Sequence, residues 1–563
     1  MPKNIVIIGG SAAGPKAAAR ARRMDPKANI TIIQKEKYLS MASCGYPYYV
    51  GGFFDDRNKL ISTPTGVVRD PKFFMNAKNV IAKTETEATA IDPKAKKVTV
   101  KSLSDGNSED ISYDKLVITT GARPKMPPIP GIDLEGITTL QSLTDADYLR
   151  KIRDEGKVKK AAVIGGGLIG VETAEALHLA GIDVIVIEML PHILSFMNPQ
   201  LAGLVENHMK VKGAHIETNN GVKEFIGTNG KLSAVKLANG TEIPAELAVM
   251  AIGVTPNVEI ARKAGVNIGE NGGIVVDDYM RTNIKDIYAA GDCIEVKNRL
   301  TGKPVHAPYG DLANLQGRII GRNVIEGDVA TTPGTVQTGI CKVFDYTVGS
   351  TGCTEETAKK AGFNPVSIVT AGPDKPGFMQ GKPLISMMVA DKKSQRIIGF
   401  QCVGMGDVSK QVAQAATAIQ GSLTVNDVVN LDLPYAPPFQ LAIDNFIGTA
   451  HVLENKMNGL FTGISAKEVK KKVEAGTDAF ILDVRGPDEY EQMRLGIGER
   501  LIPLGVLRKR LDEIPQDKSA EIIVYCKISL RGYEASRLLY GEGYTNVKVL
   551  EGGVLAWPYP REK

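Results

Sequence analysis

Two cysteines lie in sequence surroundings that suit a reactive thiolate. Cys44 belongs to the stretch SMASCGYPYYVGG, in which Ser43 and Pro47 are residue types common at the start of a helix. The partial positive charge of a helix N-terminus favours the thiolate, which is the nucleophilic form of cysteine. Cys526 belongs to a second stretch, VYCKISLRGY, and stands five residues before Arg531. Both thiols are therefore candidates for covalent sulfur chemistry, provided that the surrounding elements hold them in place.

The spacing of the cysteines argues against several other kinds of site. No two of them form a C-x-x-C pair of the kind found in metal sites and redox dithiols. We therefore expect free thiols, as is usual in the cytoplasm, and no metal site. The chain has six cysteines, namely Cys44, Cys293, Cys341, Cys353, Cys402 and Cys526.

Length and charge bound the class of protein. At 563 residues the chain is too long for one hydrophobic core, so we expect roughly three to five domains. Its 68 basic and 63 acidic residues give a net charge of +5, too mild to indicate a nucleic-acid partner. The N-terminus lacks the pattern of a signal peptide, and no run approaches the roughly 18 apolar residues of a membrane span. These features predict a cytoplasmic protein with small-molecule partners and with neither nucleic acid nor a membrane among them.

A unit of strand, glycine loop, helix and strand occurs twice, which predicts two nucleotide sites. In the second copy, Gly165, Gly167 and Gly170 follow a predicted strand and open a predicted helix. Glycines at this spacing let the backbone approach a pyrophosphate at the helix N-terminus. The next predicted strand ends in Glu188, whose carboxylate suits a ribose diol and repels a 2′-phosphate. This copy therefore predicts a site for NADH rather than NADPH.

The first copy departs from the usual glycine pattern. Its loop, GGSAAG, keeps Gly9 and Gly14 but has Ser11 at the position of the middle glycine. Gln34 stands where the ribose-binding acid is expected, two residues before Glu36. Taken alone this motif is ambiguous, so its assignment depends on the rest of the chain.

Three later segments resolve that ambiguity. In TNIKDIYAAGDC, Asp292 follows a predicted strand and resembles the second FAD motif of two-dinucleotide flavoproteins, in which the aspartate contacts the ribityl chain and flavin. The segments YDKLVITTGARP and AIGVTPN resemble the linking strands of the same superfamily. The chain is thus identified as a member of the FAD/NAD(P) disulfide-reductase superfamily. This resemblance implies contacts with FAD at Gly9, Gly14, Gln34, Asp292 and Ala313.

Within that superfamily, the surroundings of Cys44 argue against two groups of enzymes. Paired-cysteine reductases carry C-x-x-x-x-C here, but the flanking positions are Leu39 and Tyr49, and no histidine stands in the H-x-x-x-x-E context of their acid–base dyad. NADH peroxidases and oxidases combine one cysteine with a histidine in the first glycine loop, whose equivalent is about Ala12. The sequence therefore points to a single-cysteine enzyme, and away from peroxide as its main substrate.

Coenzyme A-disulfide reductases share two further motifs with this chain. Their active-site segment resembles SMASCGYPYYVGG, which includes Cys44. LDLPYAPPF resembles another family segment, and the resemblance makes Tyr435 a proton donor near the cysteine. A second family tyrosine is expected in DKPGFMQGKP, where this chain has Phe378 and Met379 instead. The resemblance therefore supports one tyrosine of a two-tyrosine mechanism.

The C-terminal segment resembles a rhodanese domain through FILDVRGPDEYEQ and IIVYCKISLRGYEASRLL. This resemblance makes Cys526–Arg531 the active loop, whose backbone N–H groups can ring a sulfur atom beside a helix N-terminus. Related phosphatases have a loop one residue longer, so the shorter loop favours sulfur. Ile528 and Leu530 make it more apolar than in rhodaneses that use thiosulfate. Asp483 and Arg485 are expected to stabilise the fold.

The expected fold is α/β, with two Rossmann-like dinucleotide-binding domains, an α+β dimerisation domain and a C-terminal α/β rhodanese domain. In the family the dimerisation domain joins two copies, so we expect a homodimer. The expected boundaries are 1–147 and 251–330 for the FAD-binding domain, 148–250 for the NADH-binding domain, 331–450 for dimerisation, 451–462 for a linker and 463–563 for rhodanese.

The resemblance covers essentially the whole chain and implies a coenzyme A-disulfide reductase–rhodanese fusion with a role in sulfur metabolism. Electrons would pass from NADH through FAD to a mixed disulfide or persulfide on Cys44, the redox-active centre. Cys526 would handle the sulfane sulfur of coenzyme A (CoA) persulfide, polysulfide or a related donor. Arg20, Arg22 and Arg23 either meet the phosphates of CoA or form a solvated helix face. Two alternatives stay open: an NADH oxidase or peroxidase using a Cys44 sulfenic acid, and a non-catalytic flavin redox sensor.

Overall fold

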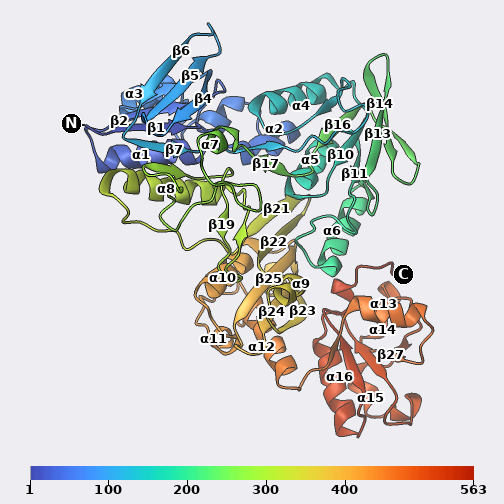
Figure 1. Cartoon of the computed structure of the whole chain (residues 1–563). Helices are drawn as coiled ribbons and strands as arrows, with labels where there is room; N and C mark the ends of the chain where they lie inside the picture. The colour runs from blue at the N-terminus through green and yellow to red at the C-terminus, as the bar shows by residue number, and fades with distance from the viewer. Residues whose placement is uncertain (1) are drawn as a thin grey trace. The chain divides into compact units, whose positions relative to one another are not determined.

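The computed structural model describes residues 2–563 and divides the chain into two compact units. The first comprises residues 1–189 and 220–335, and the second comprises residues 190–219 and 336–563. Figure 1 shows the elements of both units. Among residues 2–563, no helix is long and apolar enough to cross a membrane.

The first unit contains a parallel five-stranded sheet that begins with the predicted glycine-loop unit. Its strands are ordered β18-β7-β1-β2-β3. They are apolar runs, as expected for parallel strands covered on both faces. The strands are β1 (Asn4–Ile8), β2 (Asn29–Ile33), β3 (Ile81–Lys83), β7 (Lys115–Ile118) and β18 (Ile287–Ala289).

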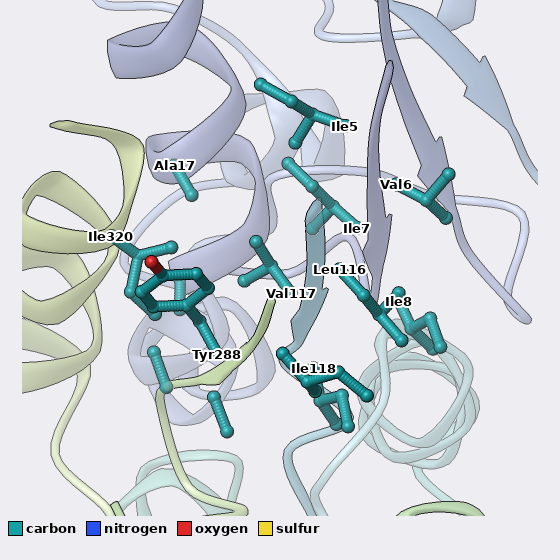
Figure 2. Packing of buried hydrophobic residues seen from close by; sticks show 14 of the residues in the cluster. Ile5, Val6, Ile7, Ile8, Ala17, Leu116, Val117, Ile118, Tyr288 and Ile320 are labelled. Carbon is teal, nitrogen blue, oxygen red and sulfur yellow. The ribbon is translucent and has the colours of Figure 1, made fainter. Parts of the chain in front are cut away.

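Helices α1 (Ala13–Met24) and α8 (Gly310–Glu326) pack against each other beside this sheet. Figure 2 shows Ala17 of α1 and Ile320 of α8 near Val117 and Tyr288, all of them buried. The two segments predicted to bind FAD therefore share one hydrophobic core, although they are far apart in the sequence. Further elements of this part are α3 (Pro71–Lys78), α7 (Glu259–Lys263) and an antiparallel sheet of β4 (Thr86–Asp92), β5 (Lys97–Ser102) and β6 (Ser108–Ser112).

The second glycine-loop unit builds another parallel sheet, in which neighbouring strands run β11-β10-β16-β9. Its strands are β10 (Lys160–Ile164), β11 (Asp183–Ile187), β16 (Leu247–Met250) and β9 (Ile137–Thr138), with α5 (Leu168–Leu179) after the glycine loop. The linking strands β8 (Ala122–Pro124) and β17 (Val254–Pro256) pair antiparallel. An antiparallel sheet of β13 (Val222–Thr228), β14 (Lys231–Leu237) and β15 (Glu242–Pro244) completes this part, together with α4 (Leu143–Glu155).

The second unit contains an antiparallel five-stranded sheet ordered β21-β22-β25-β24-β23. Helix α12 (Asn445–Met457) continues through the first part of the expected linker, so that only residues 458–462 connect it to the next strand. The other elements are β21 (Gly339–Val343), β22 (Tyr346–Gly352), β23 (Pro365–Pro373), β24 (Pro383–Asp391), β25 (Ile397–Gly404), α6 (Pro199–Val211), α9 (Glu355–Lys360), α10 (Val408–Gln420) and α11 (Val425–Val429).

The C-terminal part of this unit is a parallel sheet ordered β26-β30-β29-β27-β28. Two buried clusters form its core, one containing Leu482 and Val524 and the other containing Tyr525 and Trp557. The predicted fold class is confirmed. The elements are β26 (Gly463–Ile464), β27 (Phe480–Asp483), β28 (Arg500–Leu501), β29 (Ile522–Tyr525), β30 (Val547–Leu550), α13 (Ala466–Glu474), α14 (Pro487–Gln492), α15 (Leu504–Leu507) and α16 (Leu530–Gly541).

Candidate functional site

Cys44 lies in a single 3-10 turn, Ser43–Gly45, immediately before helix α2 (Tyr46–Gly51). The side chain of Tyr46 is buried and anchors the start of this helix, whereas Cys44 itself is exposed. A Cβ atom built on Gly310 would lie 3.7 Å from the Cys44 Sγ atom. Because Gly310 is the first residue of α8, the thiol lies beside the N-terminus of a 17-residue helix.

The sequence predicts that the helix following Cys44 favours its thiolate. In the structure, the pKa of the Cys44 thiol is shifted in the opposite direction. Partial burial raises the pKa of the Cys44 thiol, and the carboxylates of Glu172, Asp292 and Asp311 raise it further. Helix α2 has only six residues, so its N-terminus contributes little against three negative charges. The nearby carboxylates therefore favour the neutral thiol over the thiolate.

The first glycine loop forms the turn that the FAD motif requires. Gly9 has a φ of +108°, and a Cβ atom on Gly14 would lie 2.0 Å from the Gly9 carbonyl oxygen. The Gly10 N–H donates a hydrogen bond of 2.8 Å to Oε1 of Gln34, which is buried at the end of β2. The predicted residues Gly9, Gly14 and Gln34 thus come together at one end of the sheet, where the close helix–strand packing fits a bound dinucleotide.

The second FAD segment meets Cys44 at the N-terminal end of α8. Gly291 donates its N–H to Gln316 of this helix at 2.8 Å, and Ala313 is buried on the same helix. The Asp292 carbonyl oxygen lies 2.8 Å from His306 Nε2, while burial raises the pKa of the Asp292 carboxyl. Asp292 also belongs to the carboxylates that raise the Cys44 pKa. The structure therefore places Asp292 and Ala313 near the candidate nucleophile.

The second glycine loop leaves one position open for a ligand. A Cβ atom on Gly170 would lie 1.9 Å from the Gly165 carbonyl oxygen, so Gly170 is required by the packing of the loop. A Cβ atom on Gly167, in contrast, would meet no protein atom within 4 Å. Glu188 follows β11 and accepts a hydrogen bond of 2.7 Å from the N–H of Gly166. The predicted acid therefore lies at the glycine loop, as a ribose-binding role requires.

Two residues of this first unit were missed by the sequence motifs. Tyr48, one turn after Cys44, donates a hydrogen bond of 2.9 Å to Glu172 Oε1 on α5. Glu172 is also the first of the carboxylates that raise the Cys44 pKa. Helices α2 and α5 thus touch through side chains 124 residues apart, a pairing that no local spacing reveals.

The arginines proposed to bind CoA have different surroundings. Arg22 donates hydrogen bonds to the main-chain carbonyl oxygens of Pro26, Lys78 and Asn79, so its guanidinium is held by the protein. Arg23 is exposed on the same helix, and Arg20 is partly buried. The structure therefore assigns Arg22 a bracing role between α1 and the segment after α3.

The active loop of the C-terminal domain connects β29 to α16. Cys526 is fully buried at its start, and Ser529 adopts a φ of +79° at the N-terminus of the helix. Arg531 forms two hydrogen bonds with the Glu489 carboxylate, at 2.7 and 2.8 Å. The Arg531 guanidinium, acting mainly through these hydrogen bonds, lowers the pKa of Glu489 to about 2. Glu489 was missed by the sequence analysis because its partner is 42 residues away.

Four further positions singled out in the sequence lie outside this loop. Asp483 and Arg485 form a buried ion pair, and the Arg485 guanidinium lies 5.7 Å from the centroid of the Tyr525 ring. Tyr435 is 53% exposed in the second unit, in a segment without helix or strand. Phe378, at the position expected for a second tyrosine, is 76% exposed.

Comparison with known proteins places these sites in a family. The pyridine nucleotide-disulphide oxidoreductase family matches residues 3–310, its dimerisation domain matches residues 338–446, and the rhodanese-like domain matches residues 465–558. The chain belongs to the pyridine nucleotide-disulphide oxidoreductase family, whose members use FAD and NAD(P)H, and it carries a rhodanese-like domain. The resemblance inferred from the motifs is confirmed.

Individual relatives carry two kinds of description. A solved structure of a NAD-dependent persulfide reductase from A. fulgidus is 44% identical, covers 98% of this chain and 100% of its own, and has a TM-score of 0.94. An NAD(P)H coenzyme A polysulfide/persulfide reductase from Pyrococcus horikoshii is 32% identical over 81% of this chain and 99% of its own. An NADH oxidase from Methanocaldococcus jannaschii is 31% identical over 77% of this chain and 95% of its own. The similarity to the persulfide reductase thus extends through the rhodanese-like domain.

Proposed function

We propose that this chain is an NADH-dependent reductase of sulfane sulfur and CoA disulfide, in which Cys44 is the redox-active nucleophile and Cys526 is a sulfur carrier. The observation that carries the proposal is the presence of two separate thiol sites. Cys44 lies beside α8 and Asp292, and Cys526 begins a loop braced by the Arg531–Glu489 pair. The full-length similarity to a persulfide reductase supports the same combination.

The chemistry at Cys44 is a thiol–disulfide exchange. Its thiolate attacks a disulfide or persulfide, a new S–S bond forms to Cys44, and the other sulfur leaves as a thiolate. FAD, when bound, relays two electrons from NADH. With two electrons supplied in this way, the new S–S bond would be cleaved and Cys44 would return to the thiolate. For a persulfide, the overall reaction converts RSSH, NADH and a proton into RSH, hydrogen sulfide and NAD⁺.

Cys526 prepares the substrate by taking up the sulfane sulfur. Its thiolate attacks the outer sulfur of a persulfide or polysulfide and becomes a persulfide, while the remaining donor leaves as a thiolate. The loop N–H groups and the N-terminus of α16 stabilise the anionic form. Arg531 adds a positive charge whose orientation is fixed by Glu489. These features suit a carrier thiol that reloads in each cycle.

The residues around the glycine loops fit the two dinucleotides. Gly9, Gly14 and Gln34 would hold FAD together with Asp292 and Ala313. In the second loop, Gly165, Gly167, Gly170 and Glu188 would hold the pyridine nucleotide, with Glu188 favouring NADH because a 2′-phosphate would be repelled.

The proposed CoA contacts are the basic residues of the first helix. Arg20 and Arg23 would meet its phosphates, while Arg22 supports the helix through its hydrogen bonds to main-chain carbonyl oxygens. Tyr435 would donate a proton to the leaving thiolate. The name of the Pyrococcus horikoshii relative, an NAD(P)H coenzyme A polysulfide/persulfide reductase, supports this substrate class.

The proposed assembly is a homodimer in the cytoplasm. The dimerisation domain carries Phe378, Tyr435, Phe439 and Ile443, each more than half exposed. Large exposed apolar side chains in a domain that matches a dimerisation-domain family fit burial against a second copy. All six cysteines are free thiols, which suits a reducing compartment.

A comparison of substrates tests the proposal. NADH consumption is measured without oxygen, using CoA persulfide, polysulfide, CoA disulfide and hydrogen peroxide with the wild type, Cys44→Ser and Cys526→Ser. We expect sulfur substrates to exceed peroxide, Cys44→Ser to abolish all turnover, and Cys526→Ser to reduce turnover of sulfane donors while sparing CoA disulfide. Peroxide turnover above every sulfur substrate would overturn the proposal in favour of the oxidase or peroxidase that the Methanocaldococcus jannaschii relative suggests.

A further inference from the structure

A buried carboxylate of the second unit has no part in the proposed chemistry. Glu551 follows β30 directly, and only 5% of it is exposed. Its Oε1 atom lies 2.5 Å from Lys456 Nζ, and its Oε2 atom accepts a hydrogen bond of 3.1 Å from the N–H of Val369. Both partners lie outside the rhodanese-like domain, on the dimerisation-domain side. We call residues 550–558, which include Glu551, the docking segment.

The partners of Glu551 are fixed parts of their own domain. Lys456 lies in the last turn of α12 and also donates a hydrogen bond of 2.8 Å to the carbonyl oxygen of Ser367 on β23. A Cβ atom on Gly463 would lie 2.1 Å from Glu551 Oε1, so the carboxylate fills the space available to it. The ion pair therefore joins the rhodanese-like domain to the end of α12, and the hydrogen bond from Val369 joins it to β23 of the dimerisation domain.

Helix α6 holds the other end of the docking segment. Gln200 donates a buried hydrogen bond of 2.8 Å to the carbonyl oxygen of Ala556. About two turns further along, Asn207 donates a hydrogen bond of 2.6 Å to the carbonyl oxygen of Pro558. The docking segment is thus attached at both ends, through one ion pair and several hydrogen bonds to main-chain atoms.

The docking segment also forms hydrogen bonds with the active loop. Ser529 Oγ donates a hydrogen bond of 2.9 Å to the carbonyl oxygen of Leu550, and the N–H of Val554 donates one of 3.0 Å to the carbonyl oxygen of Cys526. A Cβ atom on Gly553 would lie only 2.3 Å from that Cys526 oxygen. The contacts that dock the domain and the contacts that shape its loop therefore lie on one short stretch of chain.

A buried ion pair favours one docked arrangement over others. Burial raises the pKa of the Glu551 carboxyl, and Lys456 opposes that rise. Removing a carboxylate from water is costly unless a cation and hydrogen-bond donors receive it. A displaced rhodanese-like domain would separate Glu551 from both Lys456 and the Val369 N–H. In the docked position that the structure shows, the Glu551 carboxylate therefore has both a cation and a hydrogen-bond donor.

We propose that Glu551 is a positioning residue that locks the active loop of the rhodanese-like domain onto the dimerisation domain, so that Cys526 presents sulfane sulfur from a fixed place. This inference rests on the proposed function, because it assumes that sulfur passes from Cys526 to the flavin-linked part of the enzyme. Without the lock, the domain would deliver sulfur from the end of a short tether, residues 458–462.

The test compares three rates in the full-length holoenzyme. Sulfur transfer from polysulfide to cyanide requires Cys526 alone, NADH-dependent reduction of CoA disulfide requires Cys44 alone, and NADH-dependent reduction of polysulfide requires both. The variants are Glu551→Gln, Lys456→Met and the two combined. A matched control is Lys470→Met with Glu474→Gln, an exposed ion pair on α13 of the same domain.

We expect Glu551→Gln to lower the polysulfide rate about tenfold, because a tethered domain has a lower effective concentration than a docked one. The two single-thiol rates should stay within about twofold, as should every rate of the control. Lys456→Met should lower the polysulfide rate further, since it leaves a buried carboxylate unpaired. The double variant should recover part of that loss, which a general loss of folding would not produce.

The outcomes separate this inference from the proposed function. If Glu551→Gln leaves the polysulfide rate unchanged, or lowers the cyanide rate equally, the positioning role of Glu551 is contradicted. If Cys526→Ser leaves the polysulfide rate unchanged, the proposed function itself fails, whatever Glu551 does.

Discussion

The Cys44 thiol lies between opposing electrostatic influences. The N-terminus of α8 favours the thiolate, whereas Glu172, Asp292 and Asp311 favour the neutral thiol and, together with burial, raise its pKa. Glu172 is in turn held by the hydroxyl group of Tyr48. The reactivity of the nucleophile is therefore tied to the helix that follows the second glycine loop.

Replacing Glu172 tests that connection. Glu172→Gln removes a negative charge but keeps an acceptor for Tyr48, so the Cys44 pKa should fall and more thiolate should exist near neutral pH. We expect iodoacetamide to modify Cys44 about threefold faster at pH 7.5, with the rate profile displaced to lower pH. Mass spectrometry of the Cys44 peptide gives the rate. Glu109→Gln, in the exposed strand β6, is the control, and equal rates in all three proteins would contradict the assignment.

The Arg531–Glu489 pair provides a pH-dependent prediction. A carboxyl group whose pKa is lowered in the folded state stabilises the fold at pH values above its ordinary, unfolded-state pKa. This contribution disappears as the pH falls toward the lowered pKa of about 2. Glu489→Gln should cost about 0.5–1 kcal/mol at pH 7, because about a third of each side chain is exposed. The difference in unfolding free energy should shrink below about pH 4.5, as followed by denaturant titration. A difference in unfolding free energy that stays constant down to pH 3 would contradict the role assigned to the Arg531–Glu489 pair.

At the residue scale, motifs predicted the site members that recur at fixed local spacing. Cys44, Gly170 and Cys526 belong to such motifs. Cys44 lies in the expected turn, Cys526 in the expected loop, and Gly170 near the start of helix α5. Glu172 and Glu489 were missed because each acts through a partner distant in the sequence. The motifs also do not predict the raised pKa of Cys44, because it comes from burial first and then from carboxylates of other segments.

At the scale of elements, the two glycines of the second loop should behave differently. Gly170→Ala places a Cβ atom 1.9 Å from a backbone oxygen, so it should destabilise the domain by about 2–4 kcal/mol. Gly167→Ala meets no protein atom within 4 Å and should leave stability unchanged, but it should raise the KM for NADH about tenfold if a pyrophosphate lies against it. Thermal unfolding and steady-state kinetics give the two quantities. An unchanged KM in the stable Gly167→Ala variant would contradict the proposed cofactor position.

The active loop permits a similar comparison. Gly553 has a φ of +57°, and a Cβ atom there would lie 2.3 Å from the Cys526 carbonyl oxygen. Gly553→Ala should therefore cost about 2–4 kcal/mol and distort the loop, which should reduce sulfur transfer to cyanide at least tenfold. Gly541→Ala, at the end of α16, meets nothing within 4 Å and should be neutral. Full activity in Gly553→Ala would show that the docking segment does not support the loop.

The elements themselves were largely predictable because apolar runs, glycine loops and helices alternate in a fixed order. The strands β1 and β10 and the helices after their glycine loops lie where the motifs placed them. Helix α12 continues into residues 451–462, for which the sequence predicts a linker helix or loop. This helix packs against β23 and β24, contacts that the local sequence does not reveal.

At the scale of the whole molecule, the proposed homodimer can be tested at its exposed apolar residues. Phe439 is 73% exposed in the dimerisation domain, and Phe439→Lys would place a charge in a dry interface. We expect the dimer dissociation constant to rise at least ~100-fold, as measured by sedimentation velocity over a range of concentrations. Val211→Lys, at an 84% exposed position of α6, should leave the dimer intact. A dimer that is unaffected by Phe439→Lys would place the interface elsewhere.

In the proposed mechanism, electrons from NADH break a sulfur–sulfur bond held at Cys44. The most direct measurement is the amount of hydrogen sulfide released for each NADH consumed, with CoA persulfide as substrate and oxygen excluded. The proposed chemistry predicts one sulfide for each NADH in the wild type and neither product nor consumption in Cys44→Ser. NADH consumption without sulfide release, or equal turnover in Cys44→Ser, would contradict it.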